Sequence, residues 1–576
     1  MRKFTPAALC GLLFIMFGCF LLYPIWLTVQ GGFVSTTGKG LTIHHVWSVF
    51  ADASLRAGLL NAFGIAVGTT VLALVIALPL AVLNANFEFP GKKMFSALVL
   101  IPLILPPFVG AIGLHHLLGR AGAVNALLIK MGLIETGVDF IGAGGMWAII
   151  VVIAFHLYPI LYLNATAALA NLDPALDEAA ENMGAGRWRR FRQITLPLIT
   201  PGLFAGGTIV FIWSFTELGT PLMFDYQVVT PVQIFNGIKE MEASQQPYAL
   251  TAVMLFAAIS CYVLGKMVFG GKAYAMYAKA SIQSSTTRLN RIPGVLASAL
   301  FAAVIFLAVL PHLGVILTSL TNVGQWYETV LPTHFTLVHY ENALGHSLAM
   351  GSIQNSLFYA TCAVIVDIGL GLMIGYLIVR SKIPRLAKGV LDGLSMLPLA
   401  VPGLVMAFGY VAMSLKWPFS EGAPLEGWID IIGANPDPTL LLILAYAIRR
   451  LPYVVRATVA GLEQTSGELE EAALNLGATP LRAVRTIIVP LIMANLIAGG
   501  LLAFSFAMLE VSDSLILAQR ESHFPITKAI YVLFERLGDG PHIASAMGAW
   551  GMALLAVTLI GASLMMGKKM GAIFRV

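Results

Sequence analysis

Acidic side chains follow long apolar runs at two matching places in this sequence. Glu217 follows the run that ends at Thr216, and Glu510 and Asp513 occupy the corresponding place in the second half of the chain. An ionisable group within or beside a membrane-spanning segment is costly to bury, so we treat such groups as candidates for contact with a solute. These carboxylates could attract a cation or hydrogen-bond a polyol. Alternatively, they cap or pair with nearby groups.

Other ionisable residues in the apolar runs show no spacing that indicates a catalytic or metal site. Asp367 lies inside an apolar run, where we favour a structural hydrogen bond over contact with a solute, and we expect His156 to be a satisfied core histidine. The 11 histidines show no metal-ligand spacing, and no nucleophile has a convergent base. We therefore predict neither a metal site nor catalytic residues. A G-x-x-x-x-G-K-[ST] phosphate-binding loop is also absent from the sequence.

The composition places the chain among membrane proteins. Hydrophobic residues make up 58% and charged residues 11% of its 576 residues, and the mean hydropathy is +0.84. Soluble domains have about 45–50% apolar and about 25% charged residues. So few charges cannot cover a soluble surface, which excludes soluble, disordered and collagen-like proteins. The net charge of +5 is spread over loops between apolar runs, so we expect membrane lipid as a partner and no nucleic acid.

Twelve apolar stretches are long enough to cross about 30 Å of hydrocarbon as helices. They lie near residues 7–29, 58–84, 96–118, 143–165, 198–216, 250–269, 295–319, 355–380, 391–414, 438–456, 491–511 and 543–567. The first is too long for a secretory signal and lacks a small-residue cleavage site, so we interpret it as an uncleaved span. No stretch alternates as a β-barrel strand does. We predict an all-α membrane protein with 12 transmembrane helices.

Lysine and arginine are concentrated in alternate loops. Basic clusters lie at residues 92–93, 187–192, 272–291, 380–388 and 568–575. The loop of residues 321–352 has neither lysine nor arginine. Because basic loops stay on the cytoplasmic side, this bias predicts that both termini are cytoplasmic. We expect Arg449 and Arg450 at a cytoplasmic end of their helix.

The two halves of the sequence repeat each other. Residues 178–185 match residues 471–478 at an offset of 293, which also relates Pro159 to Pro452 and Pro197 to Pro490. Upstream, Asn61 matches Asn355 at an offset of 294, and Pro102 matches Pro398 at an offset of 296. Six spans in each half preserve the orientation, so the sequence predicts two parallel six-helix repeats.

The repeats suggest domain boundaries. We expect a first repeat at residues 1–270 with its core at 57–269, a cytoplasmic linker at 271–294, and a second repeat at 295–576 with its core at 351–567. The proline-rich runs at residues 101–107 and 397–402 should break their helices. Broken helices are tolerated at membrane depth only where protein or a cavity covers the backbone.

A polar loop at residues 171–197 recurs at residues 464–490. We name these segments the first and second coupling loops. In the first, Asp173-Pro174 is typical of a helix start, and acidic residues in the first turns suit the positive end of the helix dipole. Gly184 then permits a sharp turn before a basic run. One such loop could be a solvated connector, but two copies favour a partner that is itself a symmetric or pseudo-symmetric dimer.

The pattern Glu-Ala-Ala, three residues, Gly, nine residues and Ile-x-Leu-Pro resembles the EAA loop of ATP-binding-cassette importer permeases. The first copy matches throughout, and the second has Val489 in place of Leu196. The resemblance covers nearly the whole chain and implies two fused type I, MetI-like permease domains in a bacterial inner membrane. The residues that it assigns to ATPase coupling are Glu178, Ala179, Ala180, Gly184 and Pro197, and Glu471, Ala472, Ala473, Gly477 and Pro490.

The resemblance also implies the partners. A separate cytoplasmic ATPase dimer would bind ATP and Mg and dock on the loops, and a periplasmic or other extracytoplasmic solute-binding protein would deliver the solute. The chain itself would hold no cofactor and would be no enzyme, and Glu217, Glu510 and Asp513 would line the solute path.

The solute is less closely defined by the resemblance. The sequence as a whole is similar to those of ferric-iron importer permeases, which favours ferric iron as the solute. Thiamine, phosphonate, sugar phosphate and polyamine are the alternative solutes. The alternative class is a 12-span secondary transporter, which would share the parallel halves but would not need duplicated EAA loops.

Overall fold

The computed structural model is mostly helical and describes residues 4–35, 40–104, 106–141, 145–238, 241, 244–269, 287–431 and 436–566. The chain divides into two compact units. Unit 1 comprises Met1–Arg56, Pro231–Leu255 and Thr336–Ile573, and unit 2 comprises Ala57–Thr230, Phe256–Phe335 and Phe574–Val576. Most of the linker predicted at 271–294 lies outside the described residues.

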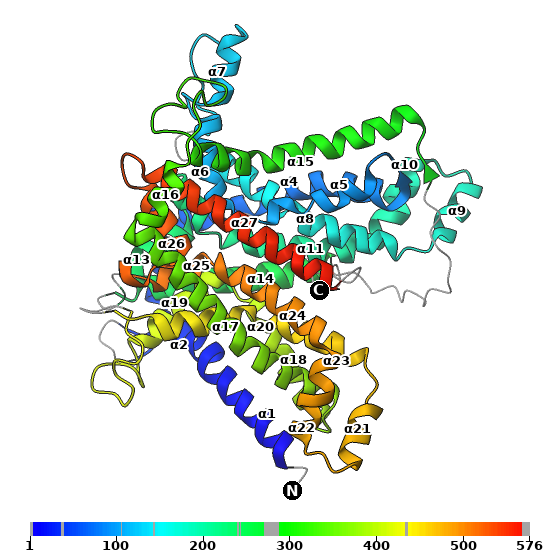
Figure 1. Ribbon diagram of the computed structural model, residues 1–576, viewed down its shortest axis with the longest axis vertical. Coiled ribbons are helices and arrows are strands. Elements are labelled where there is room, and N and C mark those ends of the chain that lie inside the picture. Colours follow the sequence, from blue (N-terminus) through cyan, green and yellow to red (C-terminus); the bar gives the residue numbers. More distant parts are fainter. Residues whose placement is uncertain are drawn as a thin grey trace. The chain divides into compact units, whose positions relative to one another are not determined.

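Unit 2 holds the core helices of the first half of the chain and one long helix from the second half (Figure 1). Strand β1 (Phe87–Glu88) pairs in parallel with β2 (Thr287–Arg288). The helices are most of α4 (Ala53–Asn86), α5 (Lys92–Leu98), the 3-10 helix η2 (Ile101–Ile104), α6 (Pro107–Leu118), α7 (Ala123–Lys130), α8 (Met146–Ala170), α9 (Pro174–Asn182), α10 (Arg187–Arg190), the π-helix η3 (Phe191–Thr195), α11 (Leu196–Phe215), α12 (Gly219–Met223), the end of α14 (Gln246–Phe269) and α15 (Arg291–Ser319).

Unit 1 holds the N-terminal helices together with the core helices of the second half. The N-terminal segment contributes α1 (Phe4–Phe17), the π-helix η1 (Gly18–Leu22), α2 (Tyr23–Phe33) and α3 (His44–Ala51). The other helices are α13 (Thr230–Gly237), the start of α14, α16 (Val338–Gly345), α17 (Ser347–Val379), α18 (Arg385–Ala400), α19 (Gly403–Ser414), α20 (Thr439–Glu463), α21 (Glu468–Asn475), α22 (Pro480–Ala483), the π-helix η5 (Val484–Ile488), α23 (Val489–Leu491), α24 (Met493–Met508), α25 (Ser512–Leu517), the 3-10 helix η6 (Glu521–His523), α26 (Ile526–Phe534) and α27 (Gly540–Met566).

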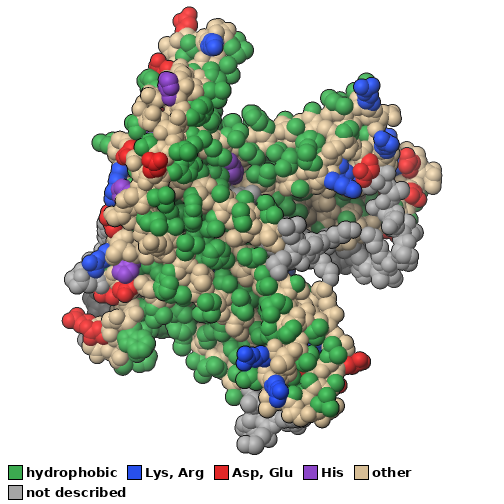
Figure 2. All heavy atoms as spheres, viewed as in Figure 1, with side chains coloured by type: hydrophobic (Ala, Val, Ile, Leu, Met, Phe, Trp, Pro, Cys, Tyr) green, Lys and Arg blue, Asp and Glu red, His purple; other side chains and the backbone are tan. Residues whose placement is uncertain are grey.

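The long helices are built to cross a membrane. Among the described residues, nine helices are long and apolar enough to do so, or up to 11 spans if each of two bent helix pairs counts as one. The stretch expected at 438–456 corresponds to α20, which carries Arg449, Arg450 and Arg456 and is not among these spans. Hydrophobic side chains cover the visible flanks of the long helices, whereas charged side chains gather near short helices such as α9, α10, α21 and α22 (Figure 2). The chain is a multi-pass membrane protein.

The expected proline breaks are confirmed in both units. In unit 1, α18 ends at Ala400 and α19 begins at Gly403, with a bend of 102° between the two axes. In unit 2, η2 ends at Ile104 and α6 begins at Pro107. Proline has no N–H to donate to the preceding turn, so the helix ends and restarts at these runs.

In each unit, a helix from the start of one half of the chain crosses a core helix of the other half. Helix α2 packs on α19 in unit 1, and α15 packs on α6 in unit 2. A Cβ atom at Gly409 would lie 2.7 Å from the carbonyl oxygen of Pro24, and one at Gly113 would lie 2.5 Å from that of Pro311. Gly113 and Gly409 are related by the offset of 296 that relates the proline runs. Both crossings therefore require glycine at the same place in the repeat.

Matching hydrogen bonds support the internal duplication. The amide Nδ2 of Asn61 donates to the carbonyl oxygen of Val228 over 2.7 Å, and that of Asn355 donates to Ser522 over 2.9 Å. Both the donors and the acceptors are related by an offset of 294. The two π-helices η3 and η5 are related by 293. Duplicated residues thus make the same local structure.

Candidate functional site

The first coupling loop is a helix, a left-handed turn and a basic helical segment. Helix α9 begins after Asp173, whose Oδ1 accepts a hydrogen bond from the backbone N–H of Ala175 over 3.0 Å. Gly184 ends it with a φ of +81°, which only glycine adopts without strain. The N–H of Ala185 bonds to the carbonyl oxygen of Ala180 over 3.0 Å, which closes the turn. The predicted helix start and turn are both confirmed.

The second coupling loop has the same construction. Ser466 Oγ accepts a hydrogen bond from the N–H of Glu468 at the start of α21, over 3.2 Å. Gly477 has a φ of +91°, and the N–H of Ala478 bonds to the carbonyl oxygen of Ala473 over 3.0 Å. In both loops, a four-residue helix and a five-residue π-helix then lead towards the next long helix. The conserved geometry follows from the repeated residues.

The predicted coupling residues lie on the outer parts of these loops. Glu178 and Glu471 are exposed, Ala180 is buried, and Gly184 and Gly477 form the turns. Sequence reasoning missed three pairs of exposed apolar side chains at matching positions. The first loop exposes Leu176, Met183 and Trp188, and the second exposes Leu469, Leu476 and Leu481 at the matching positions, with exposed fractions from 49% to 90%. We name each set of three residues the apolar triplet of its loop. The signal that could have found them is the recurrence of apolar residues at matching positions of two polar loops.

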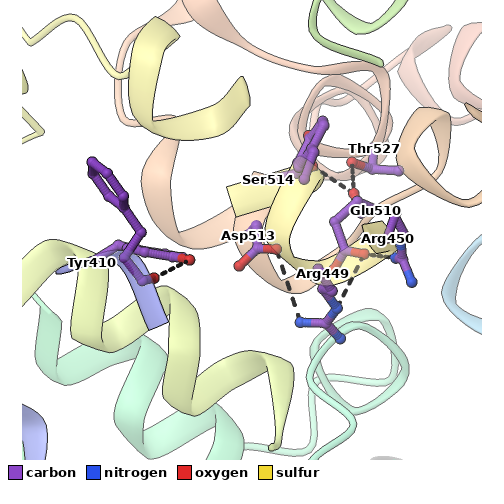
Figure 3. A network of polar contacts seen from close by, with 9 residues as sticks. Tyr410, Arg449, Arg450, Glu510, Asp513, Ser514 and Thr527 are labelled. Carbon is purple, nitrogen blue, oxygen red and sulfur yellow. Dashed lines mark hydrogen bonds and ion pairs between the residues drawn. The ribbon is translucent and has the colours of Figure 1, made fainter. Parts of the chain in front are cut away.

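A second candidate site lies in unit 1, where charged side chains from α20 meet those at the start of α25 (Figure 3). Glu510 is buried and forms an ion pair with Arg450, and its Oε2 lies 3.4 Å from Nε of Arg449. Nη1 of Arg449 lies 3.9 Å from Oδ2 of Asp513, which is 1% exposed. Thr527 Oγ1 donates to the carbonyl oxygen of Glu510 over 2.6 Å. Two buried carboxylates are thus balanced by two guanidinium groups.

The expectation for the two arginines was wrong. Arg449 and Arg450 lie in the middle of α20 rather than at its end. A charged residue in an apolar stretch is typical of a helix end when the sequence shows no nearby partner of opposite charge. These arginines instead pair with carboxylates 60 or more residues later in the chain. The signal that could have found them is an adjacent arginine pair at the positions that match His156 and Leu157 in the first repeat.

Glu217, the counterpart of Glu510, makes a different contact in unit 2. Its Oε1 accepts hydrogen bonds from the backbone N–H of Thr220 over 3.2 Å and from Oγ1 of Thr220 over 3.1 Å. Thr220 matches Asp513 at the offset of 293. The first repeat therefore uses its glutamate as a local helix cap, while the second repeat pairs its glutamate with arginine.

Asp513, one of the three predicted solute-path residues, lines a small cavity. This small cavity is bounded by Pro398, Met406, Tyr410, Ala445, Ile448, Arg449 and Asp513. Neither carboxylate oxygen of Asp513 has a hydrogen-bond partner among the described residues, and the ion pair with Arg449 is long. The Tyr410 hydroxyl is turned to the carbonyl oxygen of Phe20 (Figure 3).

The remaining candidates divide into one confirmed and one corrected expectation. Nδ1 of His156 lies 2.7 Å from the carbonyl oxygen of Pro102, so His156 is a satisfied core histidine as expected. Asp367 is fully buried in α17, but neither of its oxygens has a hydrogen-bond partner in the described part of the chain, which contradicts the expected structural hydrogen bond. Over the same residues, no group of three or more His, Cys, Asp or Glu side chains could hold a metal ion.

Comparisons with known proteins give a consistent result. Residues 73–269 and 367–566 match the model of a family described as "Binding-protein-dependent transport system inner membrane component". The "Putative ferric transport system permease protein FbpB 1" of Haemophilus influenzae is 29% identical over 93% of this chain and 80% of its own length. The "Ferric transport system permease protein FbpB" of Actinobacillus pleuropneumoniae is 28% identical over 84% of this chain and 66% of its own length.

Shorter relatives and solved structures match about half of the chain or less. The "Molybdenum transport system permease protein ModB" of Haemophilus influenzae is 29% identical over 35% of this chain and 87% of its own length. The crystal structure of a bacterial ABC transporter involved in the import of alginate matches with a TM-score of 0.38 and 19% identity, over 47% of this chain and 96% of the matched chain.

Proposed function

The chain belongs to the family of binding-protein-dependent transport system inner membrane components, and from this premise we propose that it provides the complete membrane pathway of an ATP-driven importer. A permease of this family is a transport component and not an enzyme. The matched family domain occurs twice, within the stretches that we assign to the two repeat cores at residues 57–269 and 351–567. One polypeptide would thus replace a pair of permease subunits.

The observation that carries the proposal is the duplicated coupling loop with its apolar triplet. Exposed clusters of large apolar side chains indicate an interaction surface on a polar part of a protein. Leu476 is 90% and Met183 is 81% exposed, beside acidic and basic side chains. We assign each loop to one subunit of an ATPase dimer in the cytoplasm. ATP and Mg would be bound by that dimer, and this chain would hold no cofactor.

The cycle follows from this assignment. ATP-driven closure of the ATPase dimer would draw the two coupling helices α9 and α21 together. The core helices would then open towards an extracytoplasmic solute-binding protein, and hydrolysis would return them to the inward-facing state. Such alternating access is a two-state equilibrium that ATP and the loaded binding protein bias in turn.

In this proposal the chain has 12 transmembrane helices in two parallel repeats, with both termini in the cytoplasm of a bacterium. Helix α20 would be the twelfth span, in addition to the 11 counted among the described residues when each bent helix pair is taken as one span. Its arginines are compatible with a span because Glu510 and Asp513 neutralise them inside unit 1. The basic clusters of the loops support this orientation.

We propose ferric iron as the solute. The support is the similarity, over most of the chain, to relatives whose names describe ferric transport. The solute path would include Asp513, with Glu217 and Glu510 in supporting positions. Relatives named for molybdenum transport match a shorter part of the chain. Thiamine, phosphonate, sugar phosphate and polyamine are the alternatives that a ligand assay of the captured binding protein would distinguish.

The test is affinity purification from the native host in mild detergent, with identification of bound chains by mass spectrometry. We expect an ATPase dimer to co-purify with one chain, and Glu178→Arg and Glu471→Arg to release it. Glu135→Arg, a charge reversal at an exposed site outside both loops, is the control. If no ATPase is captured and transport follows an ion gradient, the chain is a secondary transporter and the proposal is wrong.

A further inference from the structure

Polar side chains of α17 hold the second coupling loop to its unit. In unit 1, the hydroxyl of Tyr376 on α17 donates a hydrogen bond to Oε1 of Glu470 on α21 over 2.6 Å. Nε of Arg380, at the end of α17, lies 4.0 Å from Oε2 of the same carboxylate. Nη2 of Arg380 also donates to the carbonyl oxygens of Leu462 and Thr465, over 3.0 and 2.6 Å. Helix α17 thus holds the end of α20, the connection and the start of α21.

These contacts belong to the packed interior rather than to the surface. Glu470 is 8% exposed. Tyr376 packs against a buried cluster formed by Leu462, Ile488 and Ile492, together with Leu496. A hydrogen bond to a buried carboxylate is stronger than an exposed ion pair, because water competes less with it. The carboxylate therefore fixes the position of α21 relative to α17.

Among the described residues, the charged side chains of the first coupling loop form ion pairs only within that loop. Nε of Arg190 on α10 lies 3.4 Å from Oδ1 of Asp177, and Nη1 lies 2.5 Å from Oε2 of Glu181, both on α9. The positions that match Tyr376 and Arg380 at an offset of 294 hold Val82 and Asn86. The position that matches Arg190 at an offset of 293 holds Ala483. The first repeat therefore lacks counterparts of Tyr376 and Arg380, and the second coupling loop lacks a counterpart of Arg190.

Helix α17 is well placed to carry a displacement into unit 1. A Cβ atom at Gly371 would lie 2.7 Å from Val454, and one at Gly375 would lie 2.7 Å from Thr458, so α17 and α20 are in close contact near Tyr376. Closely packed helices shift together because the interior has little free volume. A pull on α21 therefore reaches α17 and α20 through side-chain contacts as well as through the chain.

From this asymmetry we infer that Tyr376, Arg380 and Glu470 are positioning residues that transmit movement of the second coupling helix to core helix α17. The first coupling helix has no such contact in the described part of the chain and moves as one piece with α10, so that its movement enters α11 along the chain. The inference rests on the proposed function, because it requires an ATPase on the loops. The two ATPase-facing loops are then unequal, and the second one drives the core more directly.

The experiment uses the purified complex of the full chain with its ATPase, and the solute-binding protein isolated from the host with its natural solute bound. Tyr376→Phe removes one hydroxyl from the contact. Tyr531→Phe is the matched control, since its hydroxyl donates to Glu535 over the same 2.6 Å outside the loops. Glu470→Gln is a conservative variant that keeps an acceptor for Tyr376. The readouts are bound ATPase, basal ATP hydrolysis, and stimulation of hydrolysis by the loaded binding protein.

We expect Tyr376→Phe to reduce the stimulation about fivefold, the effect of losing one hydrogen bond, with bound ATPase and basal hydrolysis unchanged. Glu470→Gln should retain most of the stimulation, and Tyr531→Phe all of it. Unchanged stimulation in Tyr376→Phe overturns the inference, and so does a parallel loss of ATPase binding and hydrolysis, which marks a purely structural contact. Failure of the proposed function is distinguishable, because the unaltered chain would then capture no ATPase.

Discussion

Arg450 and Glu510 form an ion pair inside unit 1 at positions where the first repeat holds Leu157 and Glu217. The glutamate is thus common to both repeats, whereas its cationic partner occurs only in the second. Arg450 also lies over the ring of Phe506, with 5.6 Å between the guanidinium carbon and the ring centroid. The duplicated permease is therefore asymmetric at this buried cluster of paired opposite charges.

Glu510→Gln should destabilise the protein much more than Glu217→Gln. Removing one partner of a buried ion pair costs about 3–5 kcal/mol, because the other charge is left buried without compensation. The amide at position 217 can still accept from Thr220, so that change should cost less than about 1 kcal/mol. Thermal unfolding in detergent measures both variants. Equal effects would show that Arg450 and Arg449 do not depend on Glu510.

The double variant Arg450→Met with Glu510→Met separates lost pairing from lost packing. Because both charges of the direct pair are removed together, the double variant should lose less stability than the sum of the losses in the two single variants. Asp513 remains as a partner for Arg449. A double variant as unstable as the sum of the singles would mean that the two side chains act independently.

The coupling loops could be predicted from sequence in detail, while the charge cluster could not. Asp173-Pro174 and Gly184 determine a helix start and a turn through contacts with residues next to them in the chain. A second copy of the same pattern then favoured a docking loop over a solvated connector. Glu510 and Arg450 are 60 residues apart, and nothing local shows that their helices meet. The packing of α2 on a core helix of the second half, and of α15 on a core helix of the first half, has equally little local signal. Glycines such as Gly113 and Gly409, which permit the crossings, mark it in the sequence.

Gly409→Val should weaken the packing of α2 on α19. An added side chain would meet the backbone of Pro24, which cannot move aside as a flexible side chain would. Overpacking of this kind costs about 1–3 kcal/mol. Gly113→Val, at the matching crossing of α15 on α6, should have a similar effect. Gly393→Val is the control, since a Cβ atom there would meet nothing within 4 Å. Unfolding temperatures equal to that of the control would argue against close crossings.

Gly184→Ala and Gly477→Ala should weaken ATPase capture without unfolding the chain. Each residue has a positive φ, where a Cβ atom costs about 1–2 kcal/mol, so the loop would favour another conformation. This corresponds to roughly tenfold weaker binding of the ATPase. Gly186→Ala is the matched control in the same loop, because Gly186 has a φ of −67° and open space around it. The measurement is a titration of ATPase against the detergent-solubilised chain.

Leu476→Asp and Met183→Asp should abolish ATPase capture while leaving the unfolding temperature unchanged. Both side chains are more than four-fifths exposed, so they stabilise little in the chain itself, yet each sits at the same place in its loop. A buried carboxylate in the complex would lose hydration without a partner, which costs several kcal/mol. Leu537→Asp tests whether any exposed leucine has this effect, because Leu537 is 99% exposed and lies outside both loops. If it releases the ATPase equally, or if the two loop variants retain the ATPase, the apolar triplets are not the docking surface.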